Sequence, residues 1–236
     1  MKTTPKIIIS AVILAIGLFT IGWGVKSGLN SISSRNRQVD VRGLADRVVD
    51  ADRVTWPIVY SVVGNDLAQL DAELATKNAV IKDFVTKGGV AEDEISVLAP
   101  ALTDRWSYNY GNDRPANRYL LKQVIVVESK NVAAVSELIS SQGQLLRSNI
   151  SLDSDDYSNP TRFEFTGLNS IKPEMIAEAT QAAREAANKF AADSDSKIGK
   201  IITAYQGQFE VSDLNAYTPQ RKKVRVVTTI TYSLED

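Results

Sequence analysis

The sequence contains no cysteine and no histidine among its 236 residues. Without these side chains the chain cannot form disulfides or bind a metal through thiolate or imidazole groups. It also cannot use a Ser-His-Asp or Cys-His nucleophile system or an imidazole acid–base step. Most familiar hydrolase and oxidoreductase mechanisms are therefore excluded, and we predict no catalytic residues, no cofactor and no metal site.

The charge is nearly balanced, with 27 lysine and arginine residues against 28 aspartate and glutamate residues. No acidic residue precedes Asp40, so removing Lys2 and Lys6 with the N-terminal segment leaves 25 basic against 28 acidic residues, a net charge of −3. Nucleic acids and anionic surfaces bind clustered positive charge. The sequence therefore predicts no nucleic-acid partner.

Residues 7–25 form a run of nineteen residues without a charge, after a basic tail of residues 1–6. At about 1.5 Å per residue a helix of this length spans roughly 28 Å, close to the roughly 30 Å hydrocarbon core of a bilayer. Trp23 near its end is typical of a membrane interface. We predict a transmembrane anchor, with the tail in the cytoplasm and the remainder in the periplasm or outside the cell. The alternative is a cleaved signal, since residues 22–24 and 31–33 fit a small-x-small cleavage site.

After a polar linker at residues 26–37, hydrophobic periodicity predicts an α+β body over residues 38–236. Pro57 within the second strand predicts an edge position or a bulge, and glycines at 88, 89 and 143 predict helix ends. Pro173 is expected to open the last helix. The pattern indicates two strand-helix-strand-strand units, each with antiparallel or mixed sheet and packed helices. The predicted strands are residues 39–41, 53–63, 95–104, 118–128, 162–166, 198–211 and 221–234, and the predicted helices are residues 66–87, 132–141 and 172–193.

Several of these segments resemble the SIMPL-domain family over residues 39–234. The segments are Val39-Asp40-Val41-Arg42-Gly43, Asp52 before the alternating strand, Gly88-Gly89-Val90 before Ile95, and the alanine-rich helix that leads into Lys197-Ile198-Gly199-Lys200-Ile201. Two positions depart from the family: Ala45 stands where a glycine is frequent, and Ala51-Asp52 stands where a Pro-Asp pair is frequent. The resemblance implies a secreted or envelope-anchored bacterial protein of unassigned activity, with some relatives forming rings or linked to stress tolerance. It supplies no catalytic residue.

Alanines recur at helical spacing in the predicted helix of residues 172–193. Small side chains in such a stripe allow another helix or a sheet to approach closely. Two interpretations remain open: packing on the protein's own sheet, or a contact between subunits of a homo-oligomer. The candidate contact residues are Ala179, Ala183 and Ala186.

The loop at residues 105–118 concentrates aromatic and arginine side chains. Trp, Tyr and Arg dominate the binding energy of protein interfaces, and a loop presents them outside the core. The loop is therefore either a contact for a partner or subunit, or an aromatic lid over one end of the sheet. Its candidate contact residues are Trp106, Tyr108, Tyr110 and Arg114.

Two charged clusters have simpler interpretations. Asp153, Asp155 and Asp156 lack the spaced ligands, glycine and distal glutamate of a calcium loop, so a solvated turn is expected. Arg221, Lys223 and Arg225 alternate along one predicted strand and should lie on its solvated face; a contact with anionic lipid or cell-wall polymer is the alternative.

Together these observations predict a non-enzymatic, membrane-tethered protein of the SIMPL type that oligomerises and supports envelope integrity or stress resistance. The first alternative is an envelope adaptor that binds another protein through the 105–118 loop. A hydrolase that uses carboxylates alone is a minor alternative, because glycoside hydrolysis needs only two carboxylates.

Overall fold

The computed structural model describes residues 16–25, 37–107, 114–153 and 157–235. Residues 16–25 are helical, and no helix within the described ranges is long and apolar enough to cross a membrane. The first nine positions of the predicted span, residues 7–15, lie outside these ranges. The described helix covers the last ten positions of the predicted span.

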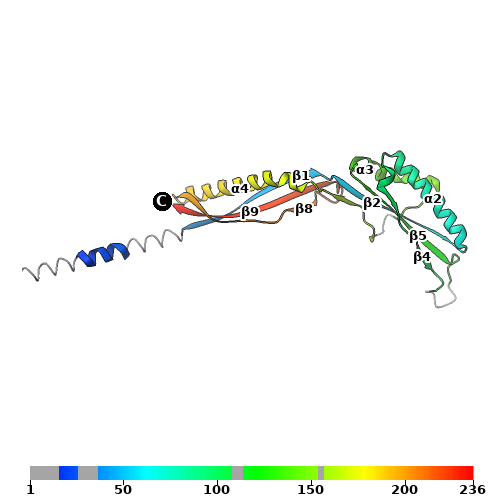
Figure 1. Ribbon diagram of the computed structural model, residues 1–236, viewed down its shortest axis with the longest axis horizontal. Helices are drawn as coiled ribbons and strands as arrows, with labels where there is room; N and C mark the ends of the chain where they lie inside the picture. Colours follow the sequence, from blue (N-terminus) through cyan, green and yellow to red (C-terminus); the bar gives the residue numbers. More distant parts are fainter. Residues whose placement is uncertain (1–15, 26–36, 108–113, 154–156, 236) are drawn as a thin grey trace, which may run out of the picture. The chain divides into compact units, whose positions relative to one another are not determined.

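Two antiparallel sheets and the helices that cover them form the α+β fold, as expected (Figure 1). One sheet has the strand order β1-β9-β7, with β8 also paired to β9, and the other has the order β3-β5-β2-β6, with β4 also paired to β5. The elements are β1 (Gln38–Asp50), β2 (Arg53–Gly64), α2 (Leu67–Lys87), η1 (Glu92–Glu94), β3 (Ile95–Val97), β4 (Ala101–Asp104), β5 (Tyr119–Ser129), α3 (Val132–Ser141), η2 (Gln142–Ser148), β6 (Arg162–Glu164), α4 (Leu168–Asp193), β7 (Lys197–Gln206), β8 (Glu210–Asp213) and β9 (Arg221–Glu235).

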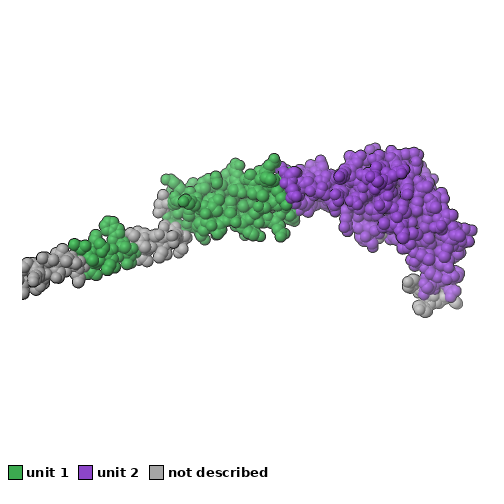
Figure 2. Space-filling view, in the orientation of Figure 1, with its two compact units in different colours: residues 1–46, 171–210, 225–236 green, residues 47–170, 211–224 purple. Residues whose placement is uncertain are grey.

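The chain divides into two compact units that do not correspond to its two halves (Figure 2). Unit 1 comprises residues 1–46, 171–210 and 225–236, and unit 2 comprises residues 47–170 and 211–224. The predicted division into a first and a second strand-helix-strand-strand unit is therefore corrected. The strand β6, expected to open the second unit, pairs with β2 through only three residues, whereas the long β1 joins the sheet of β9 and β7.

Unit 2 has its core between one face of its sheet and the helices α2 and α3. Alternate residues of β2 and β5 are buried there, because successive side chains of a strand point to opposite faces. Ile58, Ile125 and Ile81 are fully buried in this cluster, the last of them from α2. Two polar side chains on β5 are buried, and both are hydrogen-bonded: Gln123 Nε2 donates to the carbonyl oxygens of Leu98 at 2.6 Å and Val124 at 3.1 Å, and Ser129 Oγ accepts from the Asn131 amide at 3.0 Å.

The helix boundaries in unit 2 follow from capping residues. Asp66 caps α2 by accepting hydrogen bonds from the amides of Ala68 and Gln69, and Gly89 follows its end with a φ of 93°, as the glycine pair predicts. The helix α3 spans residues 132–141 as predicted, but Gly143 does not end the helical path, because the 3₁₀-helix η2 follows directly and ends at the left-handed Asn149. The predicted strand at 95–104 is split into β3 and β4, both paired with β5.

Pro57 of β2 is paired with β5 on one side, and no described residue pairs with it on the other side. It lies opposite Val126 of β5, but β6 pairs with β2 only at residues 53–55, and contact on that side resumes at the bridge between Tyr60 and Leu152. Proline has no amide hydrogen to donate, so it fits where no neighbouring strand requires one. Pro57 therefore lies in an inner strand, and its predicted edge position stays a prediction because residues 154–156 are outside the described ranges.

Unit 1 has its core between α4 and its sheet, with α4 lying along β1 and β9 in Figure 1. Gly43 allows this close contact: a Cβ atom added there would lie 1.8 Å from the Ala179 carbonyl oxygen and 2.5 Å from the Ala183 nitrogen. The expectation that Pro173 opens the helix is wrong, since α4 begins at Leu168 and contains the proline. Its start is set further upstream, where the carboxylate of Asp52 binds the amides of Thr166 and Gly167.

Candidate functional site

The hairpin of β4 and β5 in unit 2 brings Trp106 together with two arginines from the predicted contact loop. The guanidinium carbon of Arg114 lies 5.5 Å from the centre of the Trp106 ring and that of Arg118 lies 5.4 Å from it. Both separations fall within the range of cation–π attraction. The indole Nε1 also donates a hydrogen bond of 3.0 Å to the carbonyl oxygen of Pro115. The indole is thus fixed by its own loop while its ring contacts two cations.

Arg118 is held in place by Asp104, the last residue of β4. Its Nε lies 3.2 and 3.1 Å from the two carboxylate oxygens of Asp104, and its Nη2 lies 2.8 Å from Oδ2. Hydrogen bonding from Arg118 lowers the pKa of Asp104, and the same bonds raise the pKa of Arg118. Both groups therefore stay ionised at neutral pH, and Asp104 is unsuited to act as a general acid.

Of the four loop residues predicted as contacts, Trp106 and Arg114 are brought together in this cluster. Tyr108 and Tyr110 lie outside the described residues. Sequence reasoning included the loop but missed the role of Arg118, whose charge is paired with Asp104 on the neighbouring strand. Two signals in the sequence point to this pair. The alternating pattern of residues places β5 directly after Arg118, and the hairpin brings the start of β5 close to Asp104.

The three alanines predicted as contacts lie on α4 in unit 1. Ala179 and Ala183 are fully buried, and their backbones are the nearest atoms to the position of a Gly43 side chain. Ala186 is partly buried and packs against the cluster of Val41 and Ile230. In this arrangement the stripe serves the packing of the helix on its own sheet, which was one of the two interpretations.

Asp52 has a structural role that the sequence did not reveal. Its carboxylate accepts hydrogen bonds from the Thr166 amide at 2.8 and 2.9 Å and from the Gly167 amide at 2.9 Å. Burial raises the pKa of Asp52, but these hydrogen bonds outweigh burial and hold it below the usual value. The carboxylate joins two segments more than a hundred residues apart, immediately before α4 begins.

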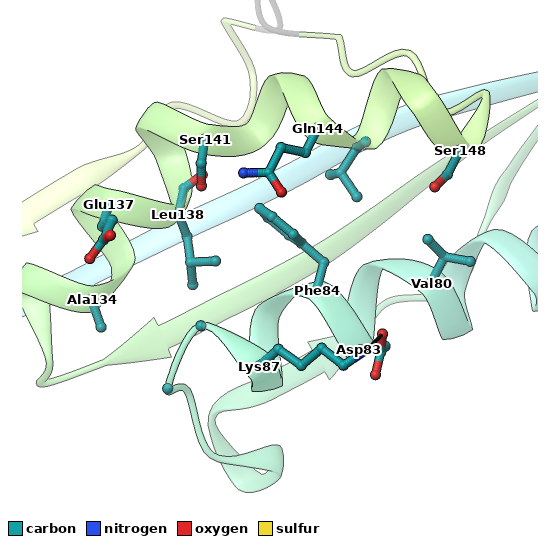
Figure 3. A pocket seen from close by; sticks show the side chains of 13 residues that line it. Val80, Asp83, Phe84, Lys87, Ala134, Glu137, Leu138, Ser141, Gln144 and Ser148 are labelled. Carbon is teal, nitrogen blue, oxygen red and sulfur yellow. Dashed lines mark hydrogen bonds and ion pairs between the residues drawn. The ribbon is translucent and has the colours of Figure 1, made fainter.

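A groove of about 650 Å³ lies between α2 and the segment formed by α3 and η2 (Figure 3). Phe84 and Leu138 point toward each other across it, and Lys87 forms an ion pair of 2.6 Å with Asp83 on its rim. Gly88 also lines the groove, and a Cβ added there would lie 2.3 Å from Cδ2 of Leu138. The groove therefore has an apolar centre with a charged rim, and sequence reasoning did not identify it.

Within the described ranges, no cluster of acidic side chains is arranged so that it could hold a metal ion. Asp153 lies 3.8 Å from the Nζ of Lys122, and the other two aspartates of the predicted turn fall outside those ranges. On β9, Val224 and Val226 are buried while Arg221 and Arg225 are exposed, as alternation predicts. Lys222 shares the buried positions of Val224 and Val226 along the strand, and its Nζ donates a hydrogen bond to Asp213.

These arrangements define an α+β protein in which each compact unit is built from separate segments of the chain. The ionised groups described above form hydrogen bonds and ion pairs that hold the fold. The family described as SIMPL, protein of unknown function (DUF541), matches residues 39–232. The chain therefore belongs to the SIMPL family, and the resemblance inferred from its sequence is confirmed. No curated protein has significant sequence similarity to it.

Proposed function

We propose that this protein is a membrane-tethered, non-enzymatic component of the bacterial envelope that oligomerises and supports envelope integrity or stress resistance. The observation that carries the proposal is the exposure of apolar side chains on β7 in unit 1. Ile201, Ile202 and Tyr205 are 47%, 49% and 69% exposed. A group of exposed apolar residues of this kind is typical of a protein contact.

The titratable groups with displaced pKa values support a non-enzymatic role, because each is used to hold the fold. Asp52 joins two segments of unit 2, and Asp104 pairs with Arg118. Burial raises the pKa of Tyr60 to about 12, and its hydroxyl donates to Asn78 at 2.8 Å. A catalytic acid or base needs a pKa close to the working pH and access to substrate. The pKa values of Asp52 and Asp104 are instead shifted further below neutral pH, and that of Tyr60 is shifted further above it.

The uncharged run at residues 7–25 and membership of the SIMPL family support the tethered location. The test is to express the full chain in a bacterium and separate its membrane and soluble fractions. Protease added to spheroplasts should degrade the domain and spare an intact cytoplasmic control protein. Recovery in the soluble cytoplasm would refute the location.

Oligomerisation is tested by light scattering of the full chain purified from membranes in a non-ionic detergent. We expect a defined multimer at micromolar concentration. A monomer across the concentration range would refute this part of the proposal.

The second candidate function is an adaptor, and the Trp106 cluster favours it. Trp and Arg are enriched among residues that dominate binding energy. Replacing Trp106 with alanine should then release a protein that co-purifies with the full chain, while leaving its multimer unchanged. If the variant retains every partner, the adaptor function is wrong.

A further inference from the structure

We propose that β7 pairs antiparallel with β7 of a second copy of this chain, which joins the two unit 1 sheets into one continuous sheet. The inference rests on the proposed oligomerisation and names its interface. Strand β7 is paired with β9 on one side, and no described residue pairs with its other side. An unpaired edge is a ready template for another strand.

The backbone groups that face this free edge follow from the register. Gly207 donates a hydrogen bond of 2.8 Å to Val227, and Thr203 and Tyr205 lie opposite Thr231 and Thr229 in the same regular stretch. Because the residues of an antiparallel strand alternate between facing one neighbour and the other, the intervening residues face away from β9. Ala204 therefore directs both its N–H and its C=O to the free edge.

The features that normally protect an edge are confined to the first part of β7 and do not extend to residues 203–206. Charged side chains, prolines and bulges discourage pairing with another chain. In β7 the register shifts lie between Ile198 and Thr203, and the only charged residues are Lys197 and Lys200. Residues 203–206 are regular in register and carry no charge, so they provide an open stretch for pairing.

The charges at the two ends of this edge favour a second copy in the antiparallel direction. Lys197 and Lys200 stand at the start of β7, and Glu210 follows its end. A two-fold axis places the basic start of β7 in each copy beside the acidic residue that follows β7 in the other copy, so this favourable contact is made twice. A parallel arrangement would instead place lysines beside lysines, and like charges across strands are destabilising.

We place the two-fold axis at Ala204. Ala204 of each copy then lies opposite itself and exchanges two backbone hydrogen bonds, while Thr203 lies opposite Tyr205 of the second copy. Lys200 comes opposite Gln208 and diagonal to Glu210 of the second copy. The pairing needs no change in the hydrogen bonds between β7 and β9, because it uses only groups that face the other way.

Disulfide trapping tests this geometry directly, since the natural chain has no cysteine. In a hydrogen-bonded antiparallel pair the two Cα atoms are about 5.5 Å apart, within the range that a disulfide spans. The full-length variant Ala204→Cys should therefore form a covalent dimer under mild oxidation. The matched control is Asn188→Cys, at an exposed position of α4. Equal trapping of both variants, or none at residue 204, would overturn the proposal.

A second pair of variants tests the backbone contact. Ala204→Pro removes the amide hydrogen that faces the free edge, whereas Ala204→Ser keeps it. The proline variant should associate roughly tenfold more weakly or worse, because two hydrogen bonds at the axis are lost. Its circular dichroism should match that of the natural chain, and the serine variant should associate normally.

The outcomes separate this inference from the proposed function. If the natural chain is a monomer by light scattering, both are wrong. If the chain is a multimer that Ala204→Pro leaves intact, the proposed oligomerisation stands and the β7 interface is wrong. If Ala204→Pro loses the helical signal in circular dichroism, the test is repeated with Tyr205→Lys. A lysine on an edge strand opposes pairing without changing the backbone. Undiminished association of Tyr205→Lys would refute the interface.

Discussion

Replacing Gly43 with alanine would place a methyl group in the contact between β1 and α4. The new Cβ would lie 1.8 Å from the Ala179 carbonyl oxygen, 2.5 Å from the Ala183 nitrogen and 2.9 Å from the Ala179 carbonyl carbon. An ordinary carbon contact begins at about 3.5 Å. The helix must therefore move outward locally by more than 1 Å, because backbone atoms cannot change rotamer to make room.

The cost of this movement falls on the core of unit 1. The helix residues Ala183 and Ala187 pack there against Val41, Ile230 and Tyr232. Inserting a methyl group into a well-packed core typically costs 1–3 kcal/mol, and a clash with backbone belongs at the upper end, about 3 kcal/mol. For a chain of this size about 1 kcal/mol lowers the melting temperature by about 2–4 °C, so we expect a fall of about 6–12 °C.

Thermal unfolding of the full chain, followed by far-ultraviolet circular dichroism, measures this effect. The matched control is Gly143→Ala in η2, where an added Cβ meets no atom within 4 Å. We expect the control to melt within about 2 °C of the natural chain, since a surface substitution usually changes the free energy of unfolding by no more than about 0.5 kcal/mol. If Gly43→Ala melts as the control does, the close contact between β1 and α4 is refuted.

Three further predictions follow from the same contacts. Asp52→Asn should lower the free energy of unfolding by about 1–2 kcal/mol at pH 7, because a neutral amide binds the Thr166 amide less strongly than a carboxylate does. The pKa of Asp52 is lowered in the folded state, so its carboxylate stabilises the fold at pH values above the unfolded pKa of about 3.9. This stabilisation is lost as the pH falls through the pKa of the folded state. The free energies of unfolding of the natural chain and the variant, measured with urea, should therefore become equal in acid. A constant difference down to pH 2 would contradict this. Arg118→Gln should raise the pKa of Asp104 toward its usual value, as measured by carboxyl carbon resonances during an NMR titration; an unchanged pKa would show that the arginine does not set it. Ala183→Leu should cost about 1–3 kcal/mol in a calorimetric melt through overpacking, and unchanged melting would show that this face of α4 meets solvent.

Local features of the fold could be predicted from the sequence because their causes are local. The helix at residues 66–87 was predicted from its apolar spacing and the capping Asp66, and the structure places α2 at Leu67–Lys87. Alternation located β2 and β5 within one or two residues. The start of α4 was misplaced because Asp52, distant in the sequence, binds the segment before it. A sequence pattern carries no signal for a hydrogen bond of that separation.

The candidate contact residues show the same limit. The loop at residues 105–118 was recognised from its composition, but the pairing of Arg118 with Asp104 depends on two strands lying side by side. The alanine stripe was visible as a pattern, yet periodicity alone left open which surface covers it. Burial of Ala179 and Ala183 against β1 comes from the tertiary structure.

The sequence by itself determined the absence of thiol and imidazole chemistry, the order of helices and strands, and membership of the SIMPL family. These properties depend on which residues are present and on how they are spaced. Only the tertiary structure decided that β1 joins β9 and β7 while β6 joins β2, and that no strand in the described part of the chain pairs with the second edge of β7. Strand pairing is set by contacts between segments far apart in the chain, and the exposure of an edge depends on what the rest of the fold fails to cover.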